Sequence, residues 1–311
     1  MTPEAAAVSS HQATDRPHER LVVRRLLVDL DAPIPRRWAG GDAFVTAFFD
    51  ALSMSFPVGE QFFIDAVRGG VAALPAQLTT AERARWHEEV RGFVGQEATH
   101  RRIHERFNAH LEAQGRRNAW GPRAQARLAR LAGADPRHAL AITAANEHFT
   151  ALLARHLLAH PRWLDGAQPR LRTLWLWHAA EEQEHRCTAF DLYRALGGDE
   201  RWRRHWMRVV TVYLLLDAWR QTLANLRADG ALASWRTWRS AACFFLGRDG
   251  LLRHTFGPWR AWFRPDFHPS VEDDGLAQRW LRDNAEAYRE VGAAPPEGSS
   301  SGIGVSAPAI T

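Results

Sequence analysis

Two Glu-x-x-His pairs stand inside long segments whose apolar residues recur with the period of an α-helix. Glu97 and His100 form the first pair, and Glu182 and His185 form the second. Residues three apart lie on one helix face, so each pair would project a carboxylate and an imidazole in the same direction. One such pair is usually part of a solvated helix face. Two pairs at positions where apolar residues would be expected favour a buried site.

Single glutamates stand in two further helical segments, Glu60 before the first pair and Glu147 between the two pairs. In chain order the pattern is Glu, Glu-x-x-His, Glu, Glu-x-x-His on four successive helices. This order is typical of ferritin-like bundles, in which four carboxylates neutralise and bridge two divalent ions. Imidazole ligands favour transition metals over Mg²⁺ and Ca²⁺. The sequence therefore predicts an all-α, ferritin-like four-helix bundle with a di-metal site, which holds two iron ions or, alternatively, manganese or zinc.

Two more histidines lie close to this pattern. His178 precedes Glu182 by one helical turn and falls on the same stripe as His185. This placement predicts a third imidazole ligand, and a histidine that only supports the site is the alternative. His104 follows His100 by one turn, and whether it binds metal or supports a ligand stays open.

Capping residues delimit the helices. Thr79 and Glu82 form a capping box, and Gly115 is suited to end the helix that they begin. Asp135 precedes a proline at a first helical position, and Pro57 predicts a break or kink in the first helix. The predicted helices span residues 41–71, 79–114, 135–160, 169–198 and 200–226.

No internal segment has the composition of a linker, so residues 21–290 are expected to form a single helical metal-binding domain. The ligand bundle would span about 41–198, and a Trp-rich helical extension would cover about 199–270. Within this extension, residues 231–268 are expected to form short helices that pack on the bundle. Polar residues 1–20 and the Pro-, Gly- and Ser-rich residues 291–311 are expected to be disordered.

Composition excludes some functions. The 40 basic and 35 acidic residues are interleaved, and a net charge of +5 does not favour nucleic-acid binding. Two cysteines, Cys187 and Cys243, cannot form a disulfide framework, which fits a reducing compartment. The chain shows no signal segment and no apolar run near the roughly 20 residues of a spanning helix. We therefore expect a soluble, cytoplasmic protein.

Tryptophan is abundant, with 14 residues, and it concentrates after the ligand bundle. The basic and aromatic segment Arg201–Trp206, followed by apolar Val209–Leu216, is similar to an amphipathic segment at a membrane surface. This region would contact lipid peripherally or frame a hydrophobic substrate pocket. Ordinary helix packing with an Arg-rich solvated side is the alternative.

Several motifs resemble a bacterial family described as predicted metal-dependent hydrolases: Phe93–His100, Trp177–His185, Ala189–Asp191 and Arg264–Pro269. The resemblance covers roughly residues 20–270 and implies a helical metal-binding protein. The chain is more remotely similar to ferritin-like di-iron arylamine N-oxygenases, which carry an extra histidine where His178 stands. That similarity supports three imidazole ligands, but shared ligands do not transfer a substrate.

Three functions are considered. The first is a di-iron oxidoreductase that activates O₂ and acts on a hydrophobic or aromatic small molecule, with electrons from a reductase or ferredoxin. The alternative is a metal-dependent hydrolase that uses water activated by two metal ions, with Glu181 or Glu184 as the catalytic base. Otherwise these two glutamates would orient ligands or meet solvent. The third is a non-catalytic iron-binding protein. A homodimer is considered as well.

Overall fold

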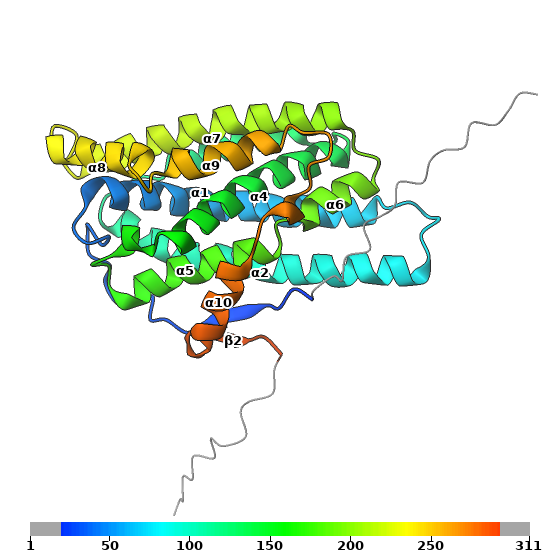
Figure 1. Ribbon diagram of the computed structural model, residues 1–311, viewed down its shortest axis with the longest axis horizontal. Coiled ribbons are helices and arrows are strands. Elements are labelled where there is room, and N and C mark those ends of the chain that lie inside the picture. Colours follow the sequence, from blue (N-terminus) through cyan, green and yellow to red (C-terminus); the bar gives the residue numbers. More distant parts are fainter. Residues whose placement is uncertain (1–19, 293–311) are drawn as a thin grey trace, which may run out of the picture.

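The computed structural model describes residues 20–292, and most of this range is helical (Figure 1). The prediction of an all-α chain is confirmed for the described residues, although these also contain one short two-stranded ribbon. The segments predicted to be disordered, 1–20 and 291–311, lie almost wholly outside the described residues.

The α-helices follow one another along the chain as α1 (Ala43–Ala72), α2 (Thr80–Ala113), α3 (Trp120–Leu128), α4 (Pro136–Ala159), α5 (Pro169–Glu184), α6 (Thr188–Ala195), α7 (Glu200–Ala228), α8 (Trp235–Leu246), α9 (Leu251–Ala261) and α10 (Gly275–Asp283). Strands β1 (Arg24–Leu26) and β2 (Tyr288–Glu290) pair in antiparallel fashion and join the two ends of the described chain. The sequence patterns did not predict α3 or this ribbon.

The predicted helix ends agree with the caps that the structure forms. The Thr79 side chain accepts from the Glu82 backbone N–H, and the Glu82 carboxylate accepts from the Thr79 N–H, which completes the capping box. Gly115 adopts a φ of 82°, a left-handed conformation that glycine reaches without strain. Asp135 caps α4, whose first residue is Pro136.

Of the break or kink predicted at Pro57, the break does not form, because α1 continues through this proline. Proline has no N–H, so the carbonyl of Ser53 loses its helical partner. The side chain of Asn108 on α2 donates to this carbonyl over 2.9 Å and replaces the missing bond. A neighbouring helix therefore compensates for the proline, and α1 remains continuous across the centre of the protein.

The predicted helix over 169–198 is interrupted at residues 185–187, between α5 and α6. Arg186, which is buried at the break, donates to the carbonyls of Gln183, Pro269 and Glu272. Two of these carbonyls belong to a segment far along the chain, so the break depends on tertiary contacts that local sequence patterns do not contain. His185 consequently caps α5 instead of continuing it.

The helices form three layers in Figure 1, with α7, α8 and α9 above, α1 and α4 in the middle, and α2 and α5 below. Helix α1 packs against α2 and α4, and α4 packs against α5. Helices α8 and α9 pack on α1 and α4, as expected for short helices of the C-terminal extension. One apolar cluster contains Phe107 and Trp175, and the other contains Phe93 and Phe190. The predicted ligands on α1, α2, α4 and α5, together with His185 at the end of α5, lie between these two clusters as a polar layer.

Substitution of Asn108 tests the contact that keeps α1 intact. We expect Asn108→Ala to lower the free energy of unfolding by about 1–3 kcal/mol, because the buried Ser53 carbonyl loses its hydrogen bond. Gln77→Ala, at an exposed turn, is the control and should change stability by less than about 0.5 kcal/mol. Urea unfolding followed by circular dichroism measures both values. Equal stability of the two variants would contradict the role given to Asn108.

Candidate metal centre

The seven predicted ligands converge in the polar layer between the apolar clusters. Each is at most 4% exposed, so none of them lies on a solvated helix face. Helix α1 supplies one ligand, α2 two, α4 one and α5 two, while the seventh caps α5. In chain order they are Glu60, Glu97, His100, Glu147, His178, Glu182 and His185.

The two Glu-x-x-His pairs form one side of the centre. Glu97, His100, Glu182 and His185 each offer a ligand atom, and these four atoms lie within 4.8 Å of one another. His185 Nε2 is 3.4 Å from Glu97 Oε1 and 3.8 Å from Glu182 Oε1. Glu147 on α4 reaches the same imidazole, with Oε2 2.8 Å from Nδ1. This spacing fits one metal ion among these side chains.

A second group of potential ligands lies directly beside the first. It consists of Glu60, His100 and His178, whose ligand atoms also lie within 4.8 Å of one another. His178 Nε2 is 4.0 Å from Glu60 Oε1 and 2.8 Å from Glu182 Oε1. The two groups share His100, and Glu182 contacts both, so the donor set suits two neighbouring ions.

Several buried donor and acceptor atoms in these side chains have no hydrogen-bond partner. Buried polar atoms are rarely left without one, so a group of them needs an explanation such as a bound ion. The unpartnered atoms are both carboxylate oxygens of Glu60 and of Glu97, Oε1 of Glu147, Oε2 of Glu182, Nδ1 of His100 and Nε2 of His185. They are oxygen and imidazole nitrogen atoms, the donors that first-row transition metals accept. The residues present therefore fit a pair of metal ions.

Burial makes negative charge costly at this centre. It raises the pKa of Glu60, Glu97 and Glu147, and repulsion from neighbouring carboxylates adds to the shift at each of them. At Glu182, burial opposes ionisation, but the charge of His185 and the close imidazoles of His100 and His178 outweigh it and lower the pKa. Cations that bind here would relieve the repulsion and stabilise the ionised carboxylates.

A hydrogen-bond chain fixes the protonation of His178. Asn108 donates to a backbone carbonyl through its amide nitrogen, so its oxygen accepts from the Ser53 hydroxyl over 2.8 Å. Ser53 Oγ then accepts from Nδ1 of His104, and Nε2 of His104 accepts from Nδ1 of His178 over 2.7 Å. Nε2 of His178 is left with a lone pair that faces Glu182 Oε1. A metal ion between these two atoms would satisfy both of them, which fits His178 as a ligand and His104 as the residue that orients it.

His100 is oriented from the opposite side. Its Nε2 donates to Glu181 over 2.9 Å, which leaves Nδ1 directed at Glu182 over 3.4 Å. Burial disfavours the charged imidazole, but the hydrogen bond to Glu181 and the closeness of the Glu182 carboxylate outweigh this and raise the pKa of His100 to about 10. An imidazole that donates its second N–H to a carboxylate is a common arrangement around bound metals.

Arg24 on β1 holds the two glutamates that were considered as catalytic bases. Its guanidinium contacts Glu181 over 3.1 Å and makes two hydrogen bonds to Glu184, of 2.7 and 2.9 Å. Gln96 also donates to Glu184 over 2.6 Å. Both carboxylates are thus engaged beside the centre, and Glu181 links Arg24 to His100. Arg24 was not predicted as a site residue, because the ribbon that carries it depends on pairing with the far end of the chain.

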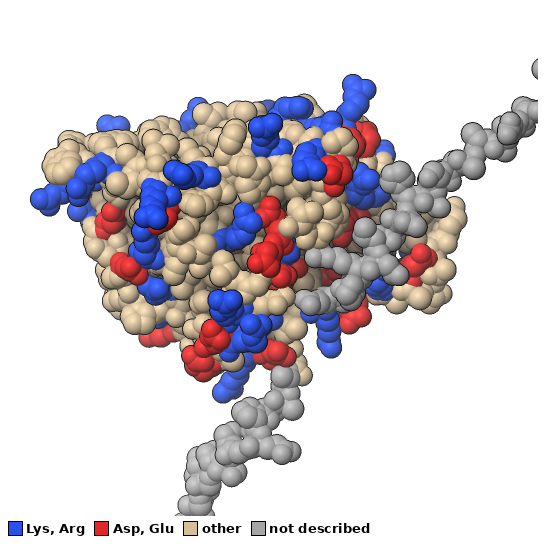
Figure 2. Space-filling model, viewed as in Figure 1, with Lys and Arg blue, Asp and Glu red and all other residues tan. Residues whose placement is uncertain are grey.

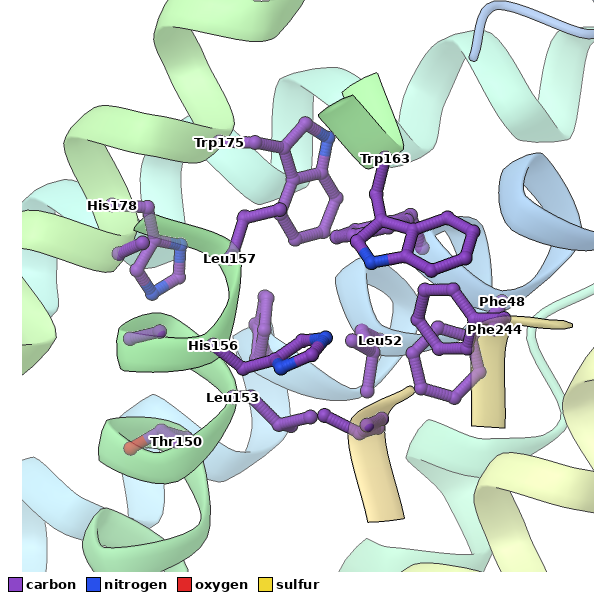
Figure 3. A pocket seen from close by; sticks show the side chains of 15 residues that line it. Phe48, Leu52, Thr150, Leu153, His156, Leu157, Trp163, Trp175, His178 and Phe244 are labelled. Atoms are coloured by element: carbon purple, nitrogen blue, oxygen red, sulfur yellow. The ribbon is translucent and has the colours of Figure 1, made fainter. Parts of the chain in front are cut away.

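Two cavities adjoin the centre. The larger, of about 420 Å³, lies among α1, α3, α4 and α7 and is lined mainly by apolar and aromatic side chains. Glu60 lines it, so this cavity reaches a predicted metal ligand. The smaller, of about 50 Å³, is almost wholly apolar, and Figure 3 shows His178 on one side of it. Phe56 and Leu153 line both cavities.

Comparison with known proteins identifies the family. Residues 22–273, which make up most of the chain, match the model of a family described as predicted metal-dependent hydrolase. The chain belongs to this family. The resemblance inferred from the motifs is therefore confirmed, and the family description agrees with the buried Glu and His cluster. Searches of curated proteins and of solved structures gave no match.

Substitution of Arg24 tests whether this residue positions the metal ligands of this family member. We expect Arg24→Gln to weaken metal binding by about 10–100-fold, because Glu181 loses its counter-charge and no longer holds His100. Arg25→Gln is the matched control, since Arg25 is the next residue of β1 but is exposed. Titration of metal-free protein measures both affinities. The same affinity in both variants would contradict the positioning role of Arg24.

Proposed function

We propose that this protein is a two-metal carboxylate enzyme of the ferritin-like type that acts on an apolar small molecule. The observation that carries the proposal is the group of unpartnered ligand atoms on Glu60, Glu97, Glu147, Glu182, His100 and His185. A protein interior tolerates such a group when cations bind to it.

The helix order supports the ferritin-like type. Ligands come from α1 and α2 and then from α4 and α5, with α3 in the longer connection between the two helix pairs. A bundle of two helix pairs joined by one long crossover is the ferritin-like arrangement.

Two iron ions, or manganese or zinc, would be held by the four glutamates together with His100, His178 and His185. Such ions supply Lewis acidity, lower the pKa of bound water and, in the case of iron, supply redox chemistry. The chain itself fixes the imidazole orientations through Glu181 and His104. Its apolar clusters exclude water from both sides of the ligand layer.

The larger cavity supports the choice of substrate class. Phe56, Phe62, Phe149 and Trp206 are among its lining residues, and Glu60 places the centre at its wall. Cavities that are mainly apolar with a few polar groups are typical of sites for small organic molecules. An aliphatic or aromatic substrate would pack against these rings with its reactive group near Glu60.

Hydrolysis is the first candidate reaction, because the family description names it. Glu181 and Glu184 remain the proposed proton acceptors for this reaction, although their bonds to Arg24 favour a positioning role. O₂-dependent oxidation is the second candidate. It is favoured by a ligand set of glutamate and histidine borne on helices, because hydrolytic two-metal sites generally use more aspartate and loop ligands. Electrons would then come from a reductase or ferredoxin.

One experiment separates these reactions. Protein purified without O₂ and loaded with iron, zinc or manganese should bind two ions per chain at the buried centre. For a hydrolase, we expect turnover of apolar esters with zinc or manganese and without O₂ or reductant. For an oxidase or oxygenase, we expect O₂ consumption with iron and an external reductant only.

The variant Glu147→Ala serves as the internal check on these activities. It removes a carboxylate that contacts His185. We expect either activity to fall by more than about 100-fold, which is more than the loss expected when a residue that only orients a metal ligand is changed. Glu105→Ala, on the exposed side of α2, should leave the rates unchanged. Two bound ions with neither reaction would instead favour the non-catalytic iron-binding function.

A membrane surface is the proposed source of the substrate. Apolar side chains are exposed on α7, a helix that also lines the larger cavity, and on α8. We name their surface the α7–α8 patch: Val212, Leu215, Leu216, Trp219, Trp235 and Trp238. The Trp219 and Trp238 rings lie 6.0 Å apart and join the two helices. Tyr213, which is 44% exposed, belongs both to α7 and to the cavity lining.

Charge around the patch fits an anionic lipid surface. After Glu200, the acidic residue in α7 is Asp217, and α8 contains no acidic residue. Asp217 is buried and forms ion pairs with Arg123 and Arg127. The exposed charges of both helices are therefore arginines, which Figure 2 shows along the upper edge of the molecule. Tryptophan and arginine together are typical of helices that lie at a lipid headgroup layer. None of the described helices is long and apolar enough to cross a bilayer.

Vesicle binding tests the α7–α8 patch. We expect the protein to co-sediment with vesicles that contain phosphatidylglycerol, and this binding should weaken at high salt. The double variant Leu215→Glu/Leu216→Glu places acids in the patch, so its affinity for the vesicles should fall at least about 10-fold. Leu27→Glu/Val291→Glu, at exposed positions next to the ribbon, is the matched control. Binding that is unaffected by the α7 substitutions would contradict the proposal.

A further inference from the structure

We propose a second metal site for a divalent transition-metal ion such as Zn²⁺, where the end of α4 meets the start of α9. It is separate from the buried centre and does not depend on the function proposed for that centre. Its residues are His156, His160, Asp249 and His254.

The side chains converge from two segments far apart in the sequence. His156 lies in the last turn of α4 and His160 is the residue that caps this helix, and their ring centroids are 4.8 Å apart. The His254 ring on α9 lies 4.9 Å from the His160 ring and 5.7 Å from the His156 ring. Asp249 precedes α9, and its carboxylate offers an oxygen within 4.8 Å of ligand atoms of His160 and His254.

The environment of His156 is a second, separate indication that an ion binds here. It is only 5% exposed, and neither of its ring nitrogens has a hydrogen-bond partner. A buried imidazole normally satisfies at least its N–H, so the absence of any partner is costly. Figure 3 shows this ring projecting from α4 into the space lined by Leu153, Trp163 and Phe244. A metal ion bound to one nitrogen would satisfy an atom that no protein group reaches.

The donors suit zinc or a similar ion. His160, Asp249 and His254 offer two imidazoles and one carboxylate whose ligand atoms lie within 4.8 Å of one another, and the His156 ring lies beside them. Zinc usually takes four ligands, and His156 would be the fourth after a small side-chain rotation. Burial and neighbouring positive groups lower the pKa of His156 to about 4 and also lower that of His160, so both rings are neutral at pH 7 and offer lone pairs. Arg162 contacts Oδ2 of Asp249 over 2.6 Å and would orient the carboxylate from the side.

An ion at this position would join the C-terminal extension to the bundle. His156 belongs to α4, while Asp249 and His254 belong to the segment that brings Phe244 and Leu251 over the smaller cavity. The ion would hold that segment against α4 without taking part in the chemistry at the buried centre. Zinc binding is therefore expected to stabilise the folded chain.

Zinc titration tests the site in the full chain. With a chromophoric chelator as competitor, we expect wild-type protein to bind one more zinc ion tightly than the double variant His160→Gln/His254→Gln. The matched control, His87→Gln, changes an exposed histidine of α2 and should behave as wild type. An equal number of zinc ions with equal affinity in the double variant and in wild type would overturn the proposal.

Two further measurements separate this site from the buried centre and from misfolding. In Glu97→Gln/Glu147→Gln protein, which lacks ligands of the buried centre, we expect one zinc ion to remain, and it should be lost when the two histidine substitutions are added. Retention of no zinc by the glutamate variant would overturn the proposal. The thermal midpoint of the histidine double variant should equal that of wild type in chelator and fall below it only with zinc. A zinc-induced rise of the same size in both proteins would also count against the site.

Discussion

Burial of four carboxylates in one layer is the constraint on which the rest of the structure depends. Glu60, Glu97, Glu147 and Glu182 lie between two apolar clusters, where an ionised carboxylate loses the stabilisation that water provides. Neighbouring negative charges add to that cost, as the raised pKa values of three of these groups show. Imidazoles alone do not provide enough contacts, since oxygens of all four remain without hydrogen-bond partners. Bound cations are the compensation that best explains why such a layer is built.

The proline in α1 shows how backbone and ligand geometry are connected. Pro57 frees the carbonyl of Ser53, and this carbonyl fixes the amide of Asn108 in one orientation. That orientation sets the direction of the Ser53 hydroxyl, which in turn assigns the protonated nitrogen of His104 and then that of His178. A residue that weakens a helix in isolation thus leads, through a chain of hydrogen bonds, to a nitrogen lone pair at the candidate metal centre.

Sequence patterns predicted what depends on local periodicity and missed what depends on distant pairing. The Glu-x-x-His spacing was sufficient to bring Glu97, Glu182 and their histidine partners together, because an α-helix fixes which residues share a face. The positioning role of Arg24 could not be predicted, since Arg24 and Glu184 are 160 residues apart and meet only when β1 pairs with β2. The break after α5 was missed for the same reason, because Arg186 bonds to carbonyls of the C-terminal segment.

The ligands and the substrate cavity come from different parts of the chain, and this limits what the ligands reveal about the reaction. Glu60 belongs to both, but α3 and α7, which complete the cavity, carry none of the seven ligands. The same carboxylates and imidazoles suit hydrolysis with zinc or manganese and oxidation with iron, so the bound metal decides between the two. Under the proposed function, substrate choice would instead depend on apolar side chains such as Trp206 and Tyr213, which lie on the helix that also exposes the α7–α8 patch. In that proposal, the tryptophan-rich extension is the part of the protein that would select and receive the substrate.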